Sequence, residues 1–330
     1  MKHLTRVGVL RGGPSSEYEI SLQTGGNVLK VLREKFGDKY HTHDILIDKE
    51  GGWHIDGMRT VPEKLSSRID IAFNALHGSY GEDGKVQKIL EAHGIPYTGS
   101  DSLSSAVGMN KILSRNVFMS QGLKIPIGKE VLSKDIEQDT LGVARELFRS
   151  FPMPAVVKPV SAGSSVGVSV VHTQKELIEG LKKAAEHGST VLIEECISGT
   201  EVTVGVIEGF RDQELYVLPV VEIVPKTKFF DYEAKYMGKS EEIVPARLAF
   251  EIKEGLSKLA KKAHQALGLR HYSRTDFIIH PKRGIYILET NTLPKLDDQS
   301  TFLKALNSVG SDAYFLIDNL IETSLSSRRN

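Results

Sequence analysis

The spacing of apolar residues in the N-terminal part of the chain predicts strands that alternate with helices. Short apolar runs at 7–10 and 69–76 are typical of buried strands, and apolar residues recur at helical spacing over 20–36 between them. A strand, a helix and a further strand in this order indicate a parallel sheet with crossover helices. Because Gly99-Ser100-Asp101 interrupts the pattern, we expect an N-terminal α/β domain over residues 1–101.

The remainder of the chain predicts two further units. The central unit, 102–196, opens with a predicted helix over 102–119. Strands are predicted at 154–158, 167–171 and 190–196, and a further helix at 174–186. The C-terminal unit, 197–330, has strand-like runs at 201–208 and 215–224, a helix over 249–267, a strand hairpin and a closing helix over 313–324. We therefore predict a multidomain fold of mixed α/β and α+β class.

Composition limits the partners more than the fold. The 330 residues, 40% apolar and 25% charged, suffice to bury a substantial core. Because 42 basic residues balance 42 acidic ones, no overall field attracts nucleic acid or an anionic membrane. No apolar run has the length of a signal peptide or a membrane span. We expect a soluble cytoplasmic protein with small-molecule partners, no nucleic acid and no membrane.

The single cysteine, Cys196, narrows the metal chemistry. It excludes an internal disulfide and a cysteine-rich metal cage, and the eleven histidines form no ligand-spaced pair. A metal in this protein is therefore expected to have mainly oxygen ligands.

Charged residues gather in the predicted C-terminal hairpin, whose strands 273–279 and 285–291 flank the turn sequence Pro281-Lys282-Arg283-Gly284. If a four-residue loop joins the strands, antiparallel register places Asp276 opposite Glu289 and Arg274 opposite Asn291. Period-two alternation then puts all four side chains on one face. Two carboxylates and an amide oxygen suit Mg²⁺, and the arginine suits a phosphate or an oxyanion. The same pattern equally fits an exposed polar face with a cross-strand ion pair.

The glycine- and serine-rich segment 155–168 is the second chemical feature. Gly163 and Gly167 free the backbone to turn its amides around an anion, and Lys158 adds a positive charge at the end of a strand. The segment continues into an alternating strand, unlike a phosphate loop that enters a helix, so we interpret it as a flap between two strands. A plain turn of this composition remains the alternative reading.

Three weaker features complete the set. The apolar strand 191–197 becomes acidic at Glu194 and Glu195, a pattern that fits either a purine-binding edge or a simple domain crossover. Lys111 indicates a function only if a nucleotide lies nearby to pair with it, and is otherwise a surface lysine of a helix. In Gly12–Glu19, Ser16 and Glu19 predict a helix capping box, and the segment lacks the GxGxxG pattern of dinucleotide-binding proteins.

Taken together and in this order, these segments resemble the D-alanine–D-alanine ligases of the ATP-grasp superfamily over essentially the whole chain. The most specific segments are Gly12–Ser21, His77-Gly78, Glu82-Asp83-Gly84, Lys158–Gly167, Asp231–Tyr236 and Arg274–Pro294. The resemblance implies an N-terminal Rossmann-like domain and an ATP-grasp pair of subdomains that hold ATP. It also implies a homodimer that makes the dipeptide of peptidoglycan precursors through a D-alanyl phosphate.

The resemblance also implies individual roles. Glu17 holds the ammonium of the first D-alanine near His77, and Ser164 and Tyr236 join Glu17 in a network that closes the site. Nucleotide contacts are expected from Lys111, Lys158, Ser165, Glu194, Glu195, Cys196, Ile197, Glu201, Phe229, Lys235 and Leu288. Asp276, Glu289 and Asn291 match ligands of two Mg²⁺ ions, for which Mn²⁺ can substitute. Arg274 matches the residue on the tetrahedral intermediate, and Lys295 and Ser300 match second-substrate contacts.

The sequence departs from the family pattern around that second-substrate position. Lys295 stands where glycine is usual, and Gln299 and Thr301 replace a His-Ser-Leu type sequence on either side of Ser300. Lys295 fits only if the backbone φ there is allowed for a residue with a side chain. Tyr236 favours an amine as second substrate, while D-serine, D-lactate and a non-catalytic nucleotide-binding role stay as alternatives. An NAD-dependent oxidoreductase is poorly supported.

Overall fold

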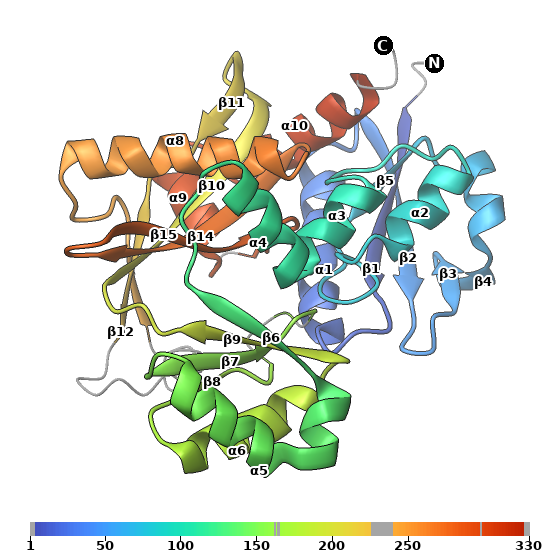
Figure 1. The fold of residues 1–330 in the computed structure, drawn as a ribbon. Coiled ribbons are helices and arrows are strands. Elements are labelled where there is room, and N and C mark those ends of the chain that lie inside the picture. Colours follow the sequence, from blue (N-terminus) through green and yellow to red (C-terminus); the bar gives the residue numbers. More distant parts are fainter. Residues whose placement is uncertain (1–3, 162, 164–165, 226–239, 298, 327–330) are drawn as a thin grey trace.

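The computed structural model describes residues 4–161, 163, 166–225, 240–297 and 299–326, which form three sheets with helices packed around them (Figure 1). No helix within these ranges is long and apolar enough to cross a membrane.

The N-terminal sheet has the strand order β4-β3-β2-β1-β5. Its strands are β1 (Thr5–Gly12), β2 (Tyr40–Ile47), β3 (Trp53–Ile55), β4 (Met58–Thr60) and β5 (Ile71–Asn74). The helices of this region are α1 (Tyr18–Lys35), a 3-10 turn (Pro62–Ser67), α2 (Lys85–Ala92) and α3 (Ser102–Met109). Strand β1 pairs in parallel with β2 and β5, so the predicted parallel sheet is confirmed. Strands β3 and β4 add an antiparallel edge that apolar spacing did not reveal.

The central sheet is entirely antiparallel, in the order β6-β9-β7-β8. It comprises β6 (Gly128–Leu132), β7 (Ala155–Pro159), β8 (Ser169–Val171) and β9 (Thr190–Glu195), and the helices α5 (Ser133–Ser150) and α6 (Gln174–Ala185) cover one face of it (Figure 1). The predicted strands and the helix α6 are confirmed, while β6 and α5 were not predicted.

The predicted helix over 102–119 is wrong, because the chain forms two helices, α3 and α4 (Lys111–Ser120). Asn110 lies between them in an extended conformation with ψ 107°. Its side-chain oxygen accepts hydrogen bonds from Ile112 N and Leu113 N at 3.0 and 3.1 Å. A capping side chain satisfies the first free amides of a helix, so Asn110 starts a new helix. The spacing of apolar residues alone predicts one continuous helix here.

The C-terminal sheet contains β13-β12-β10-β14-β15 in order, with β11 paired to β10. Its strands are β10 (Thr200–Phe210), β11 (Gln213–Val217), β12 (Val221–Pro225), β13 (Ser240–Ile243), β14 (Tyr272–His280) and β15 (Gly284–Asn291), with helices α8 (Phe250–Ala266), α9 (Thr301–Ser308) and α10 (Ala313–Ser326). The predicted strand 215–224 is therefore two strands. Each pairs with a different part of β10, which explains the break between them.

The N-terminal and C-terminal sheets share one hydrophobic core. Val9 and Phe73 from the first sheet lie in the same cluster as Leu316 and Leu320 of α10. The segment after β15 joins this cluster through Leu293, so the end of the hairpin is fixed against the N-terminal domain.

The predicted pairing within the hairpin is confirmed at its charged positions, with Arg274 opposite Asn291 and Asp276 opposite Glu289. The predicted four-residue turn is wrong. His280 pairs with Gly284, so three residues form the turn, and the register shifts by one between Asp276 and Phe277. This β-bulge restores the alternation that places the four polar side chains together.

The predicted capping box at Ser16 and Glu19 is also wrong. Helix α1 begins at Tyr18 with Glu17 at the N-cap, and no side chain of the described residues caps it. Ser15 Oγ instead accepts a hydrogen bond from Glu17 N at 3.1 Å. The turn is therefore organised around Glu17 rather than around Ser16.

Candidate active site

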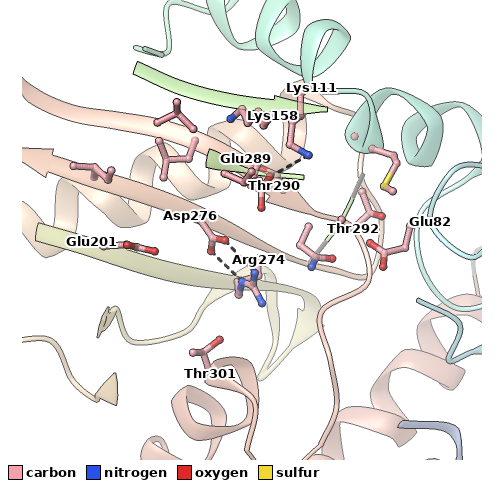
Figure 2. A pocket seen from close by; sticks show the side chains of 18 of the residues that line it. Glu82, Lys111, Lys158, Glu201, Arg274, Asp276, Glu289, Thr290, Thr292 and Thr301 are labelled. Atoms are coloured by element: carbon pink, nitrogen blue, oxygen red, sulfur yellow. Dashed lines mark hydrogen bonds and ion pairs between the residues drawn. The ribbon is translucent and has the colours of Figure 1, made fainter. Parts of the chain in front are cut away.

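A cavity of about 420 Å³ lies between the N-terminal, central and C-terminal parts of the chain, and polar residues from all three parts line it (Figure 2). The N-terminal domain contributes Glu17, His77 and Glu82 to its wall. Helix α4 contributes Lys111, and the central sheet with its following segment contributes Lys158, Glu194, Glu195, Cys196 and Ile197. The C-terminal part contributes Glu201, Arg274, Asp276, Leu288, Glu289, Asn291, Lys295, Gln299, Ser300 and Thr301.

The hairpin wall holds the four polar residues whose register the sequence predicts. Arg274 donates from Nε and Nη2 to the two carboxylate oxygens of Asp276, each at 3.0 Å. Thr203 Oγ1 on β10 donates to Asp276 Oδ1 at 2.5 Å. Asn291 Oδ1 accepts from Leu293 N at 3.1 Å, which orients its amide. Two carboxylates and an oriented amide oxygen are hard donors of the type that Mg²⁺ prefers.

Glu289 faces positive charge from helix α4. Lys111 Nζ lies 3.6 Å from its carboxylate (Figure 2). Burial by itself raises the pKa of Glu289, but the charges of Lys111, Lys158 and Arg274 outweigh that effect and lower it. Burial lowers the pKa of Lys111, and Glu289 only partly offsets this. The carboxylate therefore stays ionised and ready for a cation.

The central wall contains a charge cluster of three buried side chains. Glu194 Oε2 pairs with Lys158 Nζ, and Glu194 Oε1 accepts from Arg115 Nη1. Arg115 was not among the residues that the sequence suggested. Its only sequence signal is its place four residues after Lys111, which puts both cations on one face of a helix.

Glu195 differs from its neighbour Glu194. Its carboxylate accepts from Arg283 Nη1 and Nη2, both at 2.8 Å, and from Ile127 N at 3.0 Å. Arg283 lowers the pKa of Glu195 against the opposing effect of burial. This side chain therefore ties the hairpin turn to the central sheet.

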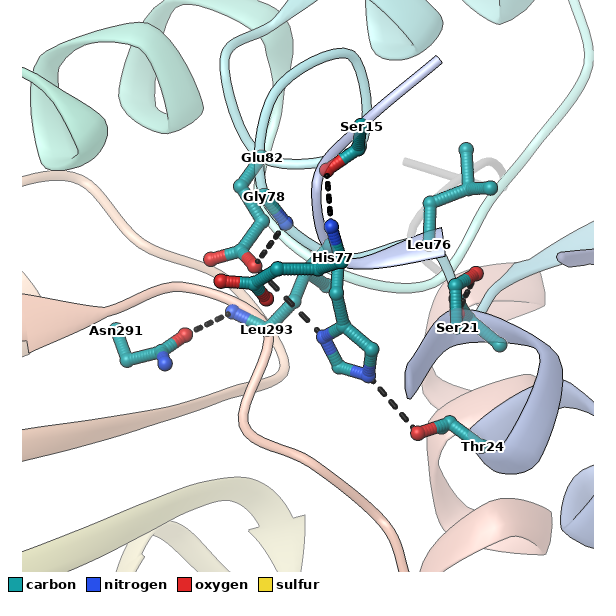
Figure 3. A network of polar contacts seen from close by, with 12 residues as sticks. Ser15, Ser21, Thr24, Leu76, His77, Gly78, Glu82, Asn291 and Leu293 are labelled. Carbon is teal, nitrogen blue, oxygen red and sulfur yellow. Dashed lines mark hydrogen bonds and ion pairs between the residues drawn. The ribbon is translucent and has the colours of Figure 1, made fainter. Parts of the chain in front are cut away.

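The N-terminal wall is a cluster of buried ionisable groups (Figure 3). Ligand atoms of Glu17, His77 and Glu82 lie within 4.8 Å of one another. His77 Nε2 is 2.9 Å from Thr24 Oγ1, and Glu82 Oε1 lies 3.7 Å from His77 Nδ1. Glu82 Oε1 also accepts from Gly78 N at 2.8 Å. Two carboxylates beside an imidazole suit an ammonium group.

Close packing explains one glycine of this wall. Gly78 has φ +70°, and a Cβ there would lie 2.6 Å from Ser15 Oγ. Only glycine meets both conditions without strain. In the sequence, Glu82 appears only as part of a motif, and the contact with His77 identifies it as a further member of the site.

The segment after the hairpin returns to the cavity. Ser300 Oγ accepts from Leu303 N at 3.2 Å and caps α9. Figure 2 shows the Thr301 hydroxyl directed toward Arg274. Among the described residues with side chains, five have a positive φ, and Lys295 is not one of them. The backbone condition for a lysine at this position is therefore met.

Five of the predicted site residues lie outside the described residues, namely Ser164, Ser165, Phe229, Lys235 and Tyr236. Gly163, next to them, is placed so that a Cβ would be 3.0 Å from Glu17 Oε1. The start of the glycine-rich segment thus approaches the N-terminal wall.

The arrangement of a central and a C-terminal sheet around a polar cavity is the ATP-grasp fold. The VanG D-Ala:D-Ser ligase from Enterococcus faecalis superposes with a TM-score of 0.84 at 29% identity, covering 98% of this chain and 100% of that one. The D-alanine–D-alanine ligase from Bacillus anthracis complexed with ATP superposes with a TM-score of 0.78 at 32% identity, covering 98% and 99%.

Sequence comparison identifies the family. The family models "D-ala D-ala ligase N-terminus" and "D-ala D-ala ligase C-terminus" match residues 56–100 and 117–322. The D-alanine–D-alanine ligase of Carboxydothermus hydrogenoformans is 36% identical over 327 residues, which cover 98% of this chain and 99% of the relative. The chain belongs to the D-alanine–D-alanine ligase family.

Proposed function

We propose that this protein joins two D-alanines into D-alanyl-D-alanine with conversion of ATP to ADP and phosphate, for peptidoglycan precursors. The observation that carries the proposal is that the cluster of Glu17, His77 and Glu82, the lysines Lys111 and Lys158, and the hairpin carboxylates line one cavity. Full-length similarity to ligases of this name supports it. The reaction passes through a D-alanyl phosphate, because oxide is too poor a leaving group for direct attack on a carboxylate.

The N-terminal cluster binds the first substrate. Glu17 accepts the ammonium of the first D-alanine, with His77 beside it. Glu82 holds His77 and the Gly78 amide. An amino acid held by its ammonium directs its carboxylate toward the nucleotide side of the cavity, which positions the reacting oxygen.

The lysines and Arg274 balance the charge that moves during phosphoryl transfer. Lys111 and Lys158 lie on the nucleotide side, and Lys235 joins them in this proposal. Arg274, held by Asp276, stabilises the oxyanion of the tetrahedral intermediate. Cys196, Ile197, Glu201 and Leu288 line the part of the cavity assigned to adenine and ribose, and Ser165 and Phe229 complete these contacts.

The donor set of the hairpin fits a divalent cation. Asp276, Glu289 and Asn291 would hold two Mg²⁺ ions, and Mn²⁺ can substitute. Bound Mg²⁺ supplies charge neutralisation of the nucleotide phosphates.

Closure of the site protects the acyl phosphate from water. We assign this task to Ser164 and Tyr236, which with Glu17 form the closing network of the family pattern. Exclusion of water also strengthens the ionic contacts inside the cavity.

The second substrate is D-alanine in this proposal, and it attacks through its amine. The backbone amide of Lys295 and the side chain of Ser300 are assigned to it, and both residues line the cavity. D-Serine and D-lactate are the alternatives, and the similarity to a D-Ala:D-Ser ligase makes D-serine the first one to test. A non-catalytic nucleotide-binding role is the remaining alternative.

The proposal also covers the domain boundaries, the oligomeric state and the location of the protein. The three units are 1–101 for the first substrate, 102–196 for the central subdomain and 197–330 for the subdomain with the metal site. The protein acts as a cytoplasmic homodimer.

A phosphate-release assay tests the function directly. Purified protein with ATP, Mg²⁺ and D-alanine should release phosphate and form the dipeptide in equal amounts. ATP turnover that ignores D-alanine would contradict the proposal. Competition between D-alanine, D-serine and D-lactate identifies the second substrate from the product that forms. The pH dependence separates D-lactate from the two amino acids, since a hydroxyl and an amine acceptor respond differently to protonation. Normal ATP affinity with no product from any of them would support the non-catalytic alternative.

A further inference from the structure

The carboxylate of Glu194 is shared between two cations. Its two oxygens contact Lys158 Nζ and Arg115 Nη1 separately, so each cation has its own acceptor. The side chains are almost completely buried, with exposed fractions of 10% for Lys158 and Arg115 and 4% for Glu194. A buried group of one anion and two cations carries a net positive charge next to the cavity.

Arg115 is held firmly in this cluster. Its Nη2 donates to the carbonyl oxygen of Pro126 at 2.7 Å, in the segment that leads into β6. Gly128 leaves room for the guanidinium, since a Cβ there would lie 2.7 Å from Nη2. The guanidinium thus links α4, the segment before β6 and strand β9.

Helix α4 connects both walls of the cavity through two cations. Lys111 and Arg115 are four residues apart and therefore lie on one face of the helix. Lys111 contacts Glu289 on β15, whereas Arg115 contacts Glu194 on β9. The backbone N of Lys111 also donates to Val160 O at 3.1 Å, just after β7. The helix therefore sets the position of both carboxylates.

The charge balance indicates what Arg115 does. A lysine that is the only partner of a buried carboxylate cannot move to another anion without leaving that carboxylate unpaired, which is strongly unfavourable. With Arg115 in place, Glu194 keeps a partner when Lys158 turns toward a phosphate. We infer that Arg115 is a positioning residue of the nucleotide site, which neutralises Glu194 and so makes Lys158 available to the phosphates of ATP.

This inference deepens the proposed function and rests on it for the identity of the ligand. The test uses binding of ATP, ADP and adenosine by titration calorimetry without D-alanine. Failure of the ligation assay therefore leaves the binding result interpretable, and failure of the binding test leaves the ligation assay unaffected.

The main variant is Arg115→Met, which keeps the length of the side chain and removes its charge. We expect affinity for ATP and ADP to fall roughly 10-fold to 100-fold, the range of a hydrogen bond to a charged group. Adenosine, which has no phosphate, should lose less than about threefold on the same scale. Arg115→Lys should retain most of the ATP affinity, and Arg149→Met, at an exposed position, is the matched control.

A second comparison, made in the Glu194→Gln variant, tests whether Arg115 acts by neutralising Glu194 or only by supporting the fold. In Glu194→Gln there is no carboxylate to neutralise, so adding Arg115→Met should change ATP affinity less than about threefold. This comparison remains decisive if Arg115→Met alone fails to fold. Equal losses for adenosine and ATP, or a loss of ATP affinity of roughly 10-fold or more when Arg115→Met is added to Glu194→Gln, would overturn the inference.

Discussion

The two walls of the cavity have opposite charge balance. On the central wall, Lys158 and Arg115 share the carboxylate of Glu194, while the carboxylate of Glu195 is balanced by its own partner, Arg283. On the hairpin wall, Asp276 and Glu289 have one arginine between them on the same sheet, Arg274. The first wall is thus prepared for an anion and the second for a cation.

This difference matches the needs of a metal-bound nucleotide. A polyphosphate requires positive charge on one side, while the cations that travel with it require oxygen ligands on the other. Lys111 on α4 lies between the walls and contacts Glu289. Separate substitutions should therefore separate the response to nucleotide from the response to metal.

The largest effect is expected on the hairpin wall. Glu289→Gln removes one carboxylate donor and should lower kcat roughly 10²- to 10³-fold, the range for loss of one preorganised electrostatic contact. The Mg²⁺ concentration for half-maximal rate should rise, because the substituted wall attracts cations less. Phosphate release measured against Mg²⁺ concentration checks this, with the exposed Glu254→Gln as control. An unchanged Mg²⁺ requirement would place the cation elsewhere.

The support of the hairpin wall should be sensitive to acid. His271 directly precedes β14, and its Nδ1 accepts from Gly99 N at 2.9 Å, so the ring is neutral. Burial lowers the pKa of His271 from 6.5 to about 4, with Arg270 and His264 acting in the same direction and Glu208 opposing. Because the unfolded chain binds the proton more readily, the stabilisation is complete above pH 6.5 and is lost as pH falls toward 4.

Denaturant unfolding at several pH values tests this point. Wild type should lose roughly 3 kcal/mol of unfolding free energy across that window through this residue. His271→Asn should lose less, since asparagine tolerates the positive φ of 65° and offers an acceptor without titrating. The exposed His172→Asn is the control and should follow wild type. Parallel curves for His271→Asn and wild type would exclude this role.

A substitution on the central wall should change the KM for ATP and leave the Mg²⁺ requirement unchanged. Lys158→Met removes a phosphate partner but leaves Glu194 paired with Arg115, so the fold is retained. We expect the KM for ATP to rise roughly 10-fold to 100-fold. The Mg²⁺ requirement at saturating ATP should stay the same. The exposed Lys182→Met serves as control, and a shift in the Mg²⁺ requirement would contradict the division between the walls.

The smallest effect is expected at Gly128. In Gly128→Ala, the new methyl group would lie 2.7 Å from Arg115 Nη2 and must displace the guanidinium. Since the far end of a long side chain can move, ATP affinity should fall only about threefold, below the loss in Arg115→Met. Calorimetry with ATP measures it. A loss larger than that of Arg115→Met would mean that the backbone, not the guanidinium, is disturbed.

The differences between the predicted and the observed elements have local causes. The predicted turn of the hairpin was one residue too long. The β-bulge shifts the register by the same one residue, so the predicted pairing of the charged residues was nevertheless correct. The helix over 102–119 failed at Asn110, where a capping side chain interrupts a continuous apolar pattern. The short strands β3 and β4 are too brief for alternation to be recognised.

Local patterning determined the contents of the hairpin wall. Arg274, Asp276, Glu289 and Asn291 are close in sequence, and alternation along two paired strands is enough to place them on one face. The family motifs further determined which residues gather around the substrates. They also placed Glu17 near His77, but neither kind of signal indicated that Arg115 pairs with Glu194.

Only the tertiary structure decided the pairing in the central wall. Arg115 and Glu194 are separated by 79 positions and lie on different elements. Such pairs meet because helix α4 and three sheets pack around one cavity. The spacing of residues along the chain does not predict that packing. The sharing of Glu194 between two cations follows from this convergence alone.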